Sequence, residues 1–217
     1  MIKAVIFDLD GTLANTLLDL SVAANLALEK QGFEPHAADE YRFFVGNGIP
    51  VMLKRASGGR AEGEILEQLK KDFFEYYNVH YCDKTDVYDG MRELVADIKK
   101  QGLKTAVVTN KEDKVAKTIV EKLYGNQFSI ICGNTEGMPA KPDPTLTLQV
   151  MKRLGVTPEE CVFLGDSGVD IQTGVNSGAV PVGETWGFRD RNELSENGAR
   201  YIIDAPAQLL GIIEELG

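Results

Sequence analysis

Short apolar runs recur at six places along the chain, each followed by small or polar residues and then by a stretch with helical periodicity. The runs are rich in β-branched residues and do not alternate with polar ones, which is typical of strands buried on both faces of a parallel sheet. Strands that alternate with helices predict an α/β fold with helices on both faces of the sheet. The predicted strands are 4–7, 105–108, 129–132, 162–164, 180–182 and 201–203.

One long interval breaks this alternation. Between residues 16 and 83, apolar positions recur at helical spacing and no strand is predicted. The clearest helices span 19–30 and 62–77. A chain of 217 residues suits one domain with an insert. We therefore predict a catalytic core formed by 1–15 and 84–217, with a small helical cap, 16–83, inserted after the first strand.

Composition narrows the class of protein. Hydrophobic residues make up 43% and charged residues 26%, as in ordinary soluble domains. A net charge of −10 disfavours nucleic acid as a partner, and no apolar run is long enough to cross a membrane. The widely spaced Cys82, Cys132 and Cys161 indicate reduced thiols. Because Asp8 interrupts the first apolar run too early for a signal peptide, we expect a cytoplasmic protein.

The first candidate motif is Asp8-Leu-Asp10-Gly11-Thr, at the end of the first strand. Two carboxylates at this spacing face the same side, so one can attack a substrate while the other transfers protons. Like charges ~4 Å apart repel by about 4 kcal/mol at an effective dielectric near 20, so the pair needs a cation such as Mg²⁺. A surface turn is the alternative, and a calcium loop is a poorer one because Gly11 comes too early and a strand precedes it.

Two further motifs follow the ends of later strands, where α/β sheets bind their ligands. Thr109 and Asn110 stand where a strand is expected to meet a helix, and could cradle a phosphate or simply cap the helix. Lys141 lies in a proline-rich loop and could offer a fixed positive charge to a phosphoryl group, or be solvated like most lysines. Asp143 in the same loop is interpreted as structural.

The fourth motif contains Asp166 at a strand end and Asp170 one helical turn later. Both side chains can face one point, so this second pair of acids predicts a metal site. The structural alternative is a helix cap formed by Asp166 or Ser167.

Taken together and in this order, the four motifs resemble those of the haloacid dehalogenase-like hydrolases. They extend over most of the predicted core, from Asp8 to Asp170. The resemblance implies a Rossmann-like parallel sheet with a cap inserted directly after the first motif. It also implies an enzyme that acts on phosphate esters, because the family's dehalogenases lack an acid at the position of Asp10.

The resemblance further implies a role for each motif. Asp8 would be the nucleophile that becomes an aspartyl-phosphate, and Asp10 would protonate the leaving group and then activate water. Thr109 and Asn110 would hold the phosphoryl group, and Lys141 would neutralise it.

The same resemblance implies a Mg²⁺ site. The ion would be held by the Asp8 carboxylate, the backbone carbonyl of Asp10, and Asp166. Asp170 would orient this metal centre.

Two stretches outside the four motifs resemble the phosphoglycolate phosphatase branch of the family. The first stretch lies in the predicted cap and contains Gly46, Asn47, Gly48 and Arg55, which would contact the substrate. The alternative for Gly46, Asn47 and Gly48 is a plain turn between helices. The other stretch is 184–189.

The function implied is that of a Mg²⁺-dependent phosphatase that hydrolyses a small phosphorylated metabolite and is a monomer or weak dimer. A sugar-phosphate mutase of the β-phosphoglucomutase type is one alternative, and a binding protein that has kept the fold without its chemistry is another.

Overall fold

A computed structural model describes residues 1–217, and the chain divides into two compact units. Met1–Ala14 and Val87–Gly217 form the first unit, and Asn15–Asp86 form the second. The chain passes from the first unit to the second in β2 (Ala14–Asn15) and returns in β3 (Asp86–Val87). These two short strands pair as a two-stranded sheet. None of the helices has both the length and the apolar character that a membrane span requires. That the second unit serves as a substrate-selecting cap stays a prediction.

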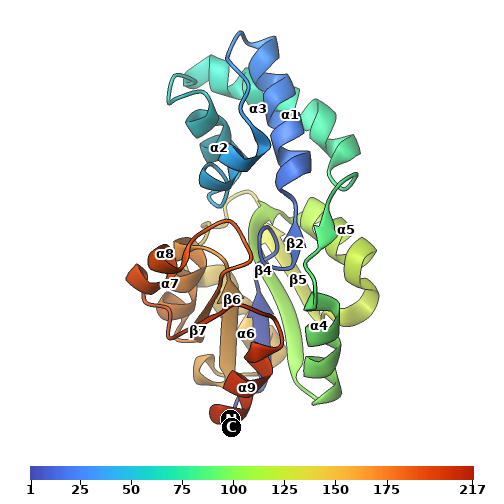
Figure 1. Ribbon diagram of the computed structural model, residues 1–217, viewed down its shortest axis with the longest axis vertical. Coiled ribbons are helices and arrows are strands. Elements are labelled where there is room, and N and C mark those ends of the chain that lie inside the picture. The colour runs from blue at the N-terminus through green and yellow to red at the C-terminus, as the bar shows by residue number, and fades with distance from the viewer. The chain divides into compact units, whose positions relative to one another are not determined.

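The first unit is built on a six-stranded sheet in the order β5-β4-β1-β6-β7-β8, in which every adjacent pair is parallel (Figure 1). All six predicted strands are confirmed, and so is the α/β fold class. The strands are β1 (Ala4–Phe7), β4 (Lys104–Glu112), β5 (Ile130–Asn134), β6 (Cys161–Gly165), β7 (Val180–Glu184) and β8 (Tyr201–Ile203). The helices are α4 (Met91–Lys100), α5 (Asp113–Tyr124), α6 (Thr145–Leu154), α7 (Gly168–Ser177), α8 (Arg191–Glu196) and α9 (Gln208–Glu215).

Both faces of this sheet are covered, as the unbroken apolar runs predict. Along β1, Ile6 belongs to a cluster that includes Val150 and Leu154 of α6. On the opposite face, Phe7 meets Phe128, just past the end of α5, edge-to-face with ring centroids 5.8 Å apart. Successive residues of a strand point to opposite faces, so each of these strands contributes to both layers of the core.

The register of the central strands determines which chain segments emerge side by side. Phe7, the last residue of β1, pairs with Val107 of β4 and with Leu164 of β6. The residues that follow these three positions therefore share one edge of the sheet. Because parallel strands end on the same side, polar residues far apart in sequence are brought together there.

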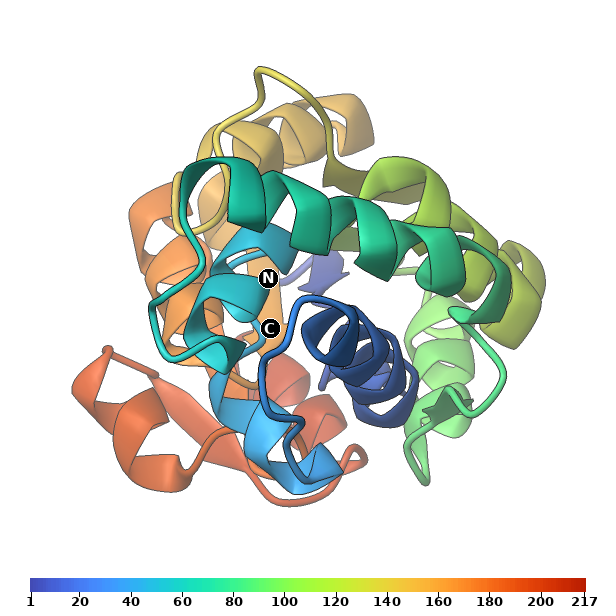
Figure 2. The same cartoon turned by 90° about the horizontal axis from the view of Figure 1, so that it is seen from above.

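The second unit is helical, as predicted. It contains α1 (Leu17–Lys30), the 3₁₀ helix η1 (Ala38–Phe43), α2 (Ile49–Ala56) and α3 (Gly63–His80). Figure 2 shows α1, in dark blue, alongside the long α3, in teal, and these two helices are in contact. The predicted helices 19–30 and 62–77 correspond to α1 and α3. Tyr41, Phe73 and Tyr77 are among its largest buried side chains, so the unit has a core of its own.

A buried carboxylate ties the start of the second unit to its end. Asp19, in the first turn of α1, accepts hydrogen bonds from the amides of Lys84 and Thr85 at 3.0 and 2.8 Å. Its Oδ2 also accepts from the Thr85 hydroxyl at 2.7 Å. The chain therefore leaves this unit beside the helix with which it entered.

Replacing Asp19 with alanine is expected to lower the free energy of unfolding by about 3 kcal/mol, because several buried donors lose their acceptor. Thr85→Val removes only the hydroxyl and is expected to cost about 1 kcal/mol. Urea unfolding measures both, with Asp39→Ala as control because that side chain is 83% exposed. Equal stability of the Asp19 and Asp39 variants would contradict this role for Asp19.

Candidate active site

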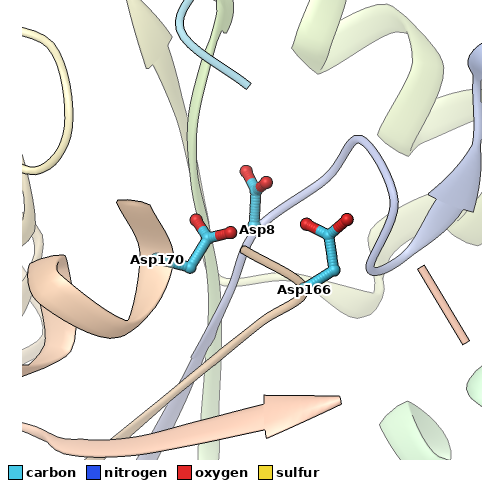
Figure 3. Close-up of side chains that lie close together, drawn as sticks. All are labelled: Asp8, Asp166 and Asp170. Atoms are coloured by element: carbon cyan, nitrogen blue, oxygen red, sulfur yellow. The ribbon is translucent and has the colours of Figure 1, made fainter. Parts of the chain in front are cut away.

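Three buried carboxylates meet at the carboxyl edge of the sheet. Asp8 follows β1, Asp166 follows β6, and Asp170 lies in the first turn of α7. One oxygen from each lies within 4.8 Å of the others, and Figure 3 shows the three groups around a common space. Asp8 is only 7% exposed, so the first motif is not a surface turn.

The Lys141 ammonium lies between two of these carboxylates. Its Nζ is 2.8 Å from Oδ1 of Asp8 and 2.6 Å from Oδ1 of Asp170, and it also lies 5.5 Å from the centre of the Phe163 ring. Burial by itself lowers the pKa of Lys141, but the carboxylates of Asp170 and Asp8 more than offset this, so the pKa is raised. With 5% of its surface exposed, Lys141 is a fixed positive charge and not a solvated lysine.

Asn110 holds the loop that carries Lys141. The amide of Lys141 donates to Oδ1 of Asn110 at 2.8 Å, and Nδ2 of Asn110 donates to the Lys141 carbonyl at 3.2 Å. Within the same loop, Oδ1 of Asp143 accepts from the amide of Thr145 at the start of α6, in agreement with its structural interpretation. The side chain of Asn110 is thus engaged with protein backbone, and its predicted contact with phosphate stays a prediction.

Both oxygens of Asp170 are engaged by the protein. Oδ1 accepts from Lys141, and Oδ2 accepts from the Ser167 hydroxyl at 2.6 Å and from the Ser167 amide at 3.2 Å. Ser167 is the N-cap residue of α7, so the structural alternative for this motif is also correct. Asp170 therefore links Lys141 to the start of α7, and its predicted role in orienting a metal stays a prediction.

Asp166 is held by a segment that comes after β7. Its Oδ2 accepts from the amide of Phe188 at 2.8 Å. Gly11 also packs against this carboxylate: its φ is +94°, and a Cβ there would come within 2.2 Å of the same oxygen. Only glycine combines that backbone conformation with so close an approach.

Glu184 folds the segment that reaches Asp166. It is fully buried, and its Oε2 accepts from the amides of Trp186 and Gly187 at 2.7 and 3.0 Å. Burial and the nearby Asp166 raise the pKa of Glu184. Trp186 is partly buried and donates from Nε1 to the carbonyl of Thr12 at 3.1 Å. Sequence reasoning found this stretch only through its family resemblance, since nothing in its spacing points to Asp166.

The electrostatics of the carboxylates fit a divalent cation. Burial and the neighbouring Asp170 raise the pKa of Asp8 to about 7, although Lys141 opposes this. Burial and the charges of Asp170 and Asp8 likewise raise the pKa of Asp166. Of the three acids, only Asp8 and Asp170 contact the Lys141 ammonium, so negative charge remains at the cluster, and hard oxygen ligands of this kind suit Mg²⁺. Asp8 and Asp166 are the best candidate ligands, since both oxygens of Asp170 have protein donors.

Mg²⁺ affinity is expected to depend on pH. The pKa of Asp8 is raised from 3.8 to about 7, so without metal the folded state loses stability as pH rises between these values. Mg²⁺ requires the ionised carboxylate, so its affinity should rise up to about tenfold per pH unit below ~7 and level off above. Calorimetric titration at pH 6 and pH 8 measures this. Equal affinity at the two values would contradict the assignment of Asp8 as a ligand.

Thr109 and Asn110 lie inside β4, because that strand continues to Glu112 and α5 begins only at Asp113. Neither residue is therefore the N-cap of the helix, and the expected strand-to-helix junction falls later in the chain. Thr109 is buried, and its hydroxyl accepts from the amide of Lys111 at 3.3 Å. Its predicted contact with phosphate is untested.

Asp10 pairs with a lysine that sequence reasoning did not assign to the site. Nζ of Lys111 lies 3.0 Å from Oδ1 and 3.2 Å from Oδ2 of Asp10. One feature of the sequence points to this lysine: Lys111 comes two residues after Thr109. If the strand continues that far, the two side chains lie on the same face of it. The apolar run ends at Val108, so the sequence pattern predicts a strand that ends there and does not place Lys111 beside Asp10, whereas β4 continues to Glu112.

The predicted cap residues lie together in the second unit. Gly46, Asn47 and Gly48 link η1 to α2, so the alternative of a helix-linking turn describes their backbone. Arg55 donates to the carbonyl of Phe44 at 3.0 Å and to Oδ1 of Asn47 at 2.9 Å. Contact of these residues with a substrate stays a prediction.

Comparison with known proteins identifies the family. The model for haloacid dehalogenase-like hydrolases matches residues 5–183. A phosphoglycolate phosphatase from Pseudomonas putida is 32% identical over 213 residues, which cover 96% of this chain and 78% of that protein.

Solved structures agree with this match. An inferred phosphoglycolate phosphatase from Lactobacillus delbrueckii subsp. bulgaricus superposes with a TM-score of 0.92 at 32% identity, covering 97% of this chain and 98% of that one. An inferred β-phosphoglucomutase from Thermotoga maritima gives 0.75 at 26% identity, with 99% of each chain covered. The predicted resemblance is confirmed: the chain belongs to the haloacid dehalogenase-like hydrolase family.

Proposed function

We propose that this chain is a Mg²⁺-dependent phosphatase that hydrolyses small phosphate monoesters, of the phosphoglycolate type, through an aspartyl-phosphate on Asp8. The observation that carries the proposal is the position of Lys141, whose ammonium contacts both Asp8 and Asp170 inside a cluster of buried acids. Such a group of perturbed carboxylates beside a fixed cation is what phosphoryl transfer needs, since the charge of the phosphoryl oxygens must be neutralised.

In the first step, an oxygen of Asp8 forms a bond to phosphorus as the bond from phosphorus to the ester oxygen breaks. The departing oxygen takes that electron pair and receives a proton from Asp10, so the product leaves as an alcohol. Lys141 stays beside Asp8 throughout and offers its charge to the phosphoryl oxygens.

In the second step, water attacks the aspartyl-phosphate. Asp10, now ionised, takes a proton from the water as oxygen bonds to phosphorus, and the electron pair of the broken bond returns to the Asp8 carboxylate. Division of the displacement into two steps lets one acid serve first as donor and then as acceptor. Mg²⁺, held by Asp8, Asp166 and the backbone carbonyl of Asp10, would supply further positive charge to the phosphoryl oxygens.

Two alternatives have less support. A mutase shares this core, and the neighbour named β-phosphoglucomutase lies at a lower TM-score and identity than the neighbour named phosphoglycolate phosphatase. A binding protein without chemistry would have no physical need to bury three acids together, two of them in contact with one lysine. We also propose a cytoplasmic location, a small phosphorylated metabolite as substrate, and a monomer or weak dimer in solution.

The first test is hydrolysis of p-nitrophenyl phosphate by the purified protein with Mg²⁺ and after its removal with EDTA. We expect turnover only with the metal, and release of inorganic phosphate from 2-phosphoglycolate among a panel of metabolite esters. Isomerised sugar phosphate without net release of phosphate would favour the mutase. Inactivity across the whole panel would favour the binding protein.

A further inference from the structure

Lys111 is a buried cation that the steps described above do not use. Its side chain is 4% exposed, and its Nζ contacts both oxygens of Asp10, at 3.0 and 3.2 Å. The two residues are 101 positions apart in sequence, so the fold itself brings them together. A lysine is rarely buried to this degree without a partner that needs its charge.

The strand determines where this ammonium lies. Burial alternates at the end of β4: Thr109 and Lys111 are buried, Asn110 is half-buried and Glu112 is exposed. Lys111 therefore lies on the same side of the strand as Thr109. Because β4 pairs directly with β1, this side chain can reach the segment that follows β1, where Asp10 lies.

The site thus contains two ammonium groups with separate partners. Lys141 contacts Asp8 and Asp170, whereas Lys111 contacts Asp10. A contact to both oxygens fixes the rotation of the Asp10 carboxylate, which a contact to one oxygen would leave free. The Asp10 side chain is 19% exposed and the Asp8 side chain 10%. Because the surrounding protein encloses Asp10 less, the contact with Lys111 contributes more to holding its carboxylate in one orientation.

We propose that Lys111 is a positioning residue for Asp10: its contact with both oxygens sets the rotation of the carboxyl group, and so the direction in which one of these oxygens faces the ester oxygen of the substrate. This inference rests on the proposed function, because it assigns Lys111 to the proton transfer in the first step. Removal of Lys111 leaves the attack of Asp8 and the charge of Lys141 in place. It lets the Asp10 carboxylate rotate, so the departing oxygen is protonated less often.

The nature of the leaving group separates this role from others. p-Nitrophenolate is a stable anion and departs without a proton, whereas the alkoxide of an alkyl ester must be protonated as it leaves. A residue that serves only proton donation therefore matters for alkyl esters and little for p-nitrophenyl phosphate. A residue that binds phosphate or maintains the site matters equally for both.

The experiment compares kcat/KM of the wild type and Lys111→Met for 2-phosphoglycolate and p-nitrophenyl phosphate. This ratio reports events up to formation of the aspartyl-phosphate, so later attack by water does not affect it. We expect a fall of about 100-fold for the alkyl ester and less than about fivefold for the aryl ester. Lys111→Arg, which keeps the charge, is expected to restore at least ~10-fold of the loss with the alkyl ester.

A double variant checks the partner. In an Asp10→Asn background, Lys111→Met should change kcat/KM for the alkyl ester by less than about twofold, since the group it positions is gone. A persistent large effect there, equal losses with the two esters, or no loss with either would overturn the proposal. Should Lys111→Met fail to fold, Lys111→Gln takes its place under the same criteria. Inactivity of the wild type on both esters would instead refute the proposed function.

Discussion

Asp8→Asn is expected to lower kcat for p-nitrophenyl phosphate by at least about 10⁴-fold, because the amide cannot form the aspartyl-phosphate. The substitution preserves shape and removes one of three buried, mutually repelling carboxylates. Since burial and Asp170 raise the pKa of Asp8 to about 7, the neutral side chain should leave the fold intact at pH 8. Steady-state kinetics with Mg²⁺ present measure the loss.

Asp97→Asn is the matched control, since this aspartate is exposed on α4 and should retain wild-type activity. Thermal unfolding of both variants separates lost chemistry from lost structure. Residual turnover above roughly a tenth of wild type in a folded Asp8→Asn variant would be incompatible with Asp8 as nucleophile.

After Asp8→Asn, the largest effect is expected for Lys141→Met, which should lower both the activity and the stability of the protein. It leaves Asp8 and Asp170 buried without their common cation, which should lower the free energy of unfolding by about 3–5 kcal/mol at pH 8. The loss should be smaller at pH 5, where Asp8, whose pKa is raised to about 7, is largely protonated. Activity should fall about 10³-fold, because a fixed charge next to the phosphoryl group is lost.

Two variants control this experiment. Lys141→Arg keeps the charge and should lose less stability than Lys141→Met, whereas Lys152→Met, on the exposed side of α6, should change neither property. Urea unfolding at pH 5 and pH 8, together with kinetics, measures all three. A loss of stability relative to wild type that is as large at pH 5 as at pH 8 would contradict the assigned ion pair between Lys141 and Asp8.

The sheet and the principal acids of the site could be predicted from sequence because both follow from local patterns. Unbroken β-branched runs give buried parallel strands, and the parallel arrangement then determines that strand ends share one edge. These patterns placed Asp8 and Asp166 at strand ends, the family resemblance assigned them to one Mg²⁺ site, and the structure brings them together with Asp170. Resemblance to a family added roles that spacing alone left open.

What escaped prediction depends on contacts between distant segments. Lys111 was missed because β4 continues through polar residues, and polarity is an ordinary sign that a strand has ended. The amide of Phe188 reaches Asp166 only because buried Glu184 folds its loop, and a backbone donor leaves no trace in sequence. α2 was not predicted either, since it is short and begins beside a proline.

The central claim is that Asp8 carries the phosphoryl group during turnover, and trapping that intermediate tests it most directly. The enzyme would be mixed with Mg²⁺ and p-nitrophenyl phosphate, quenched in acid within milliseconds and treated with borohydride, which reduces an acyl phosphate to an alcohol. Peptide mass spectrometry should then find homoserine at position 8, and only in samples that received substrate. Homoserine at a different aspartate, or unmodified Asp8 in enzyme quenched during rapid turnover, would contradict the account.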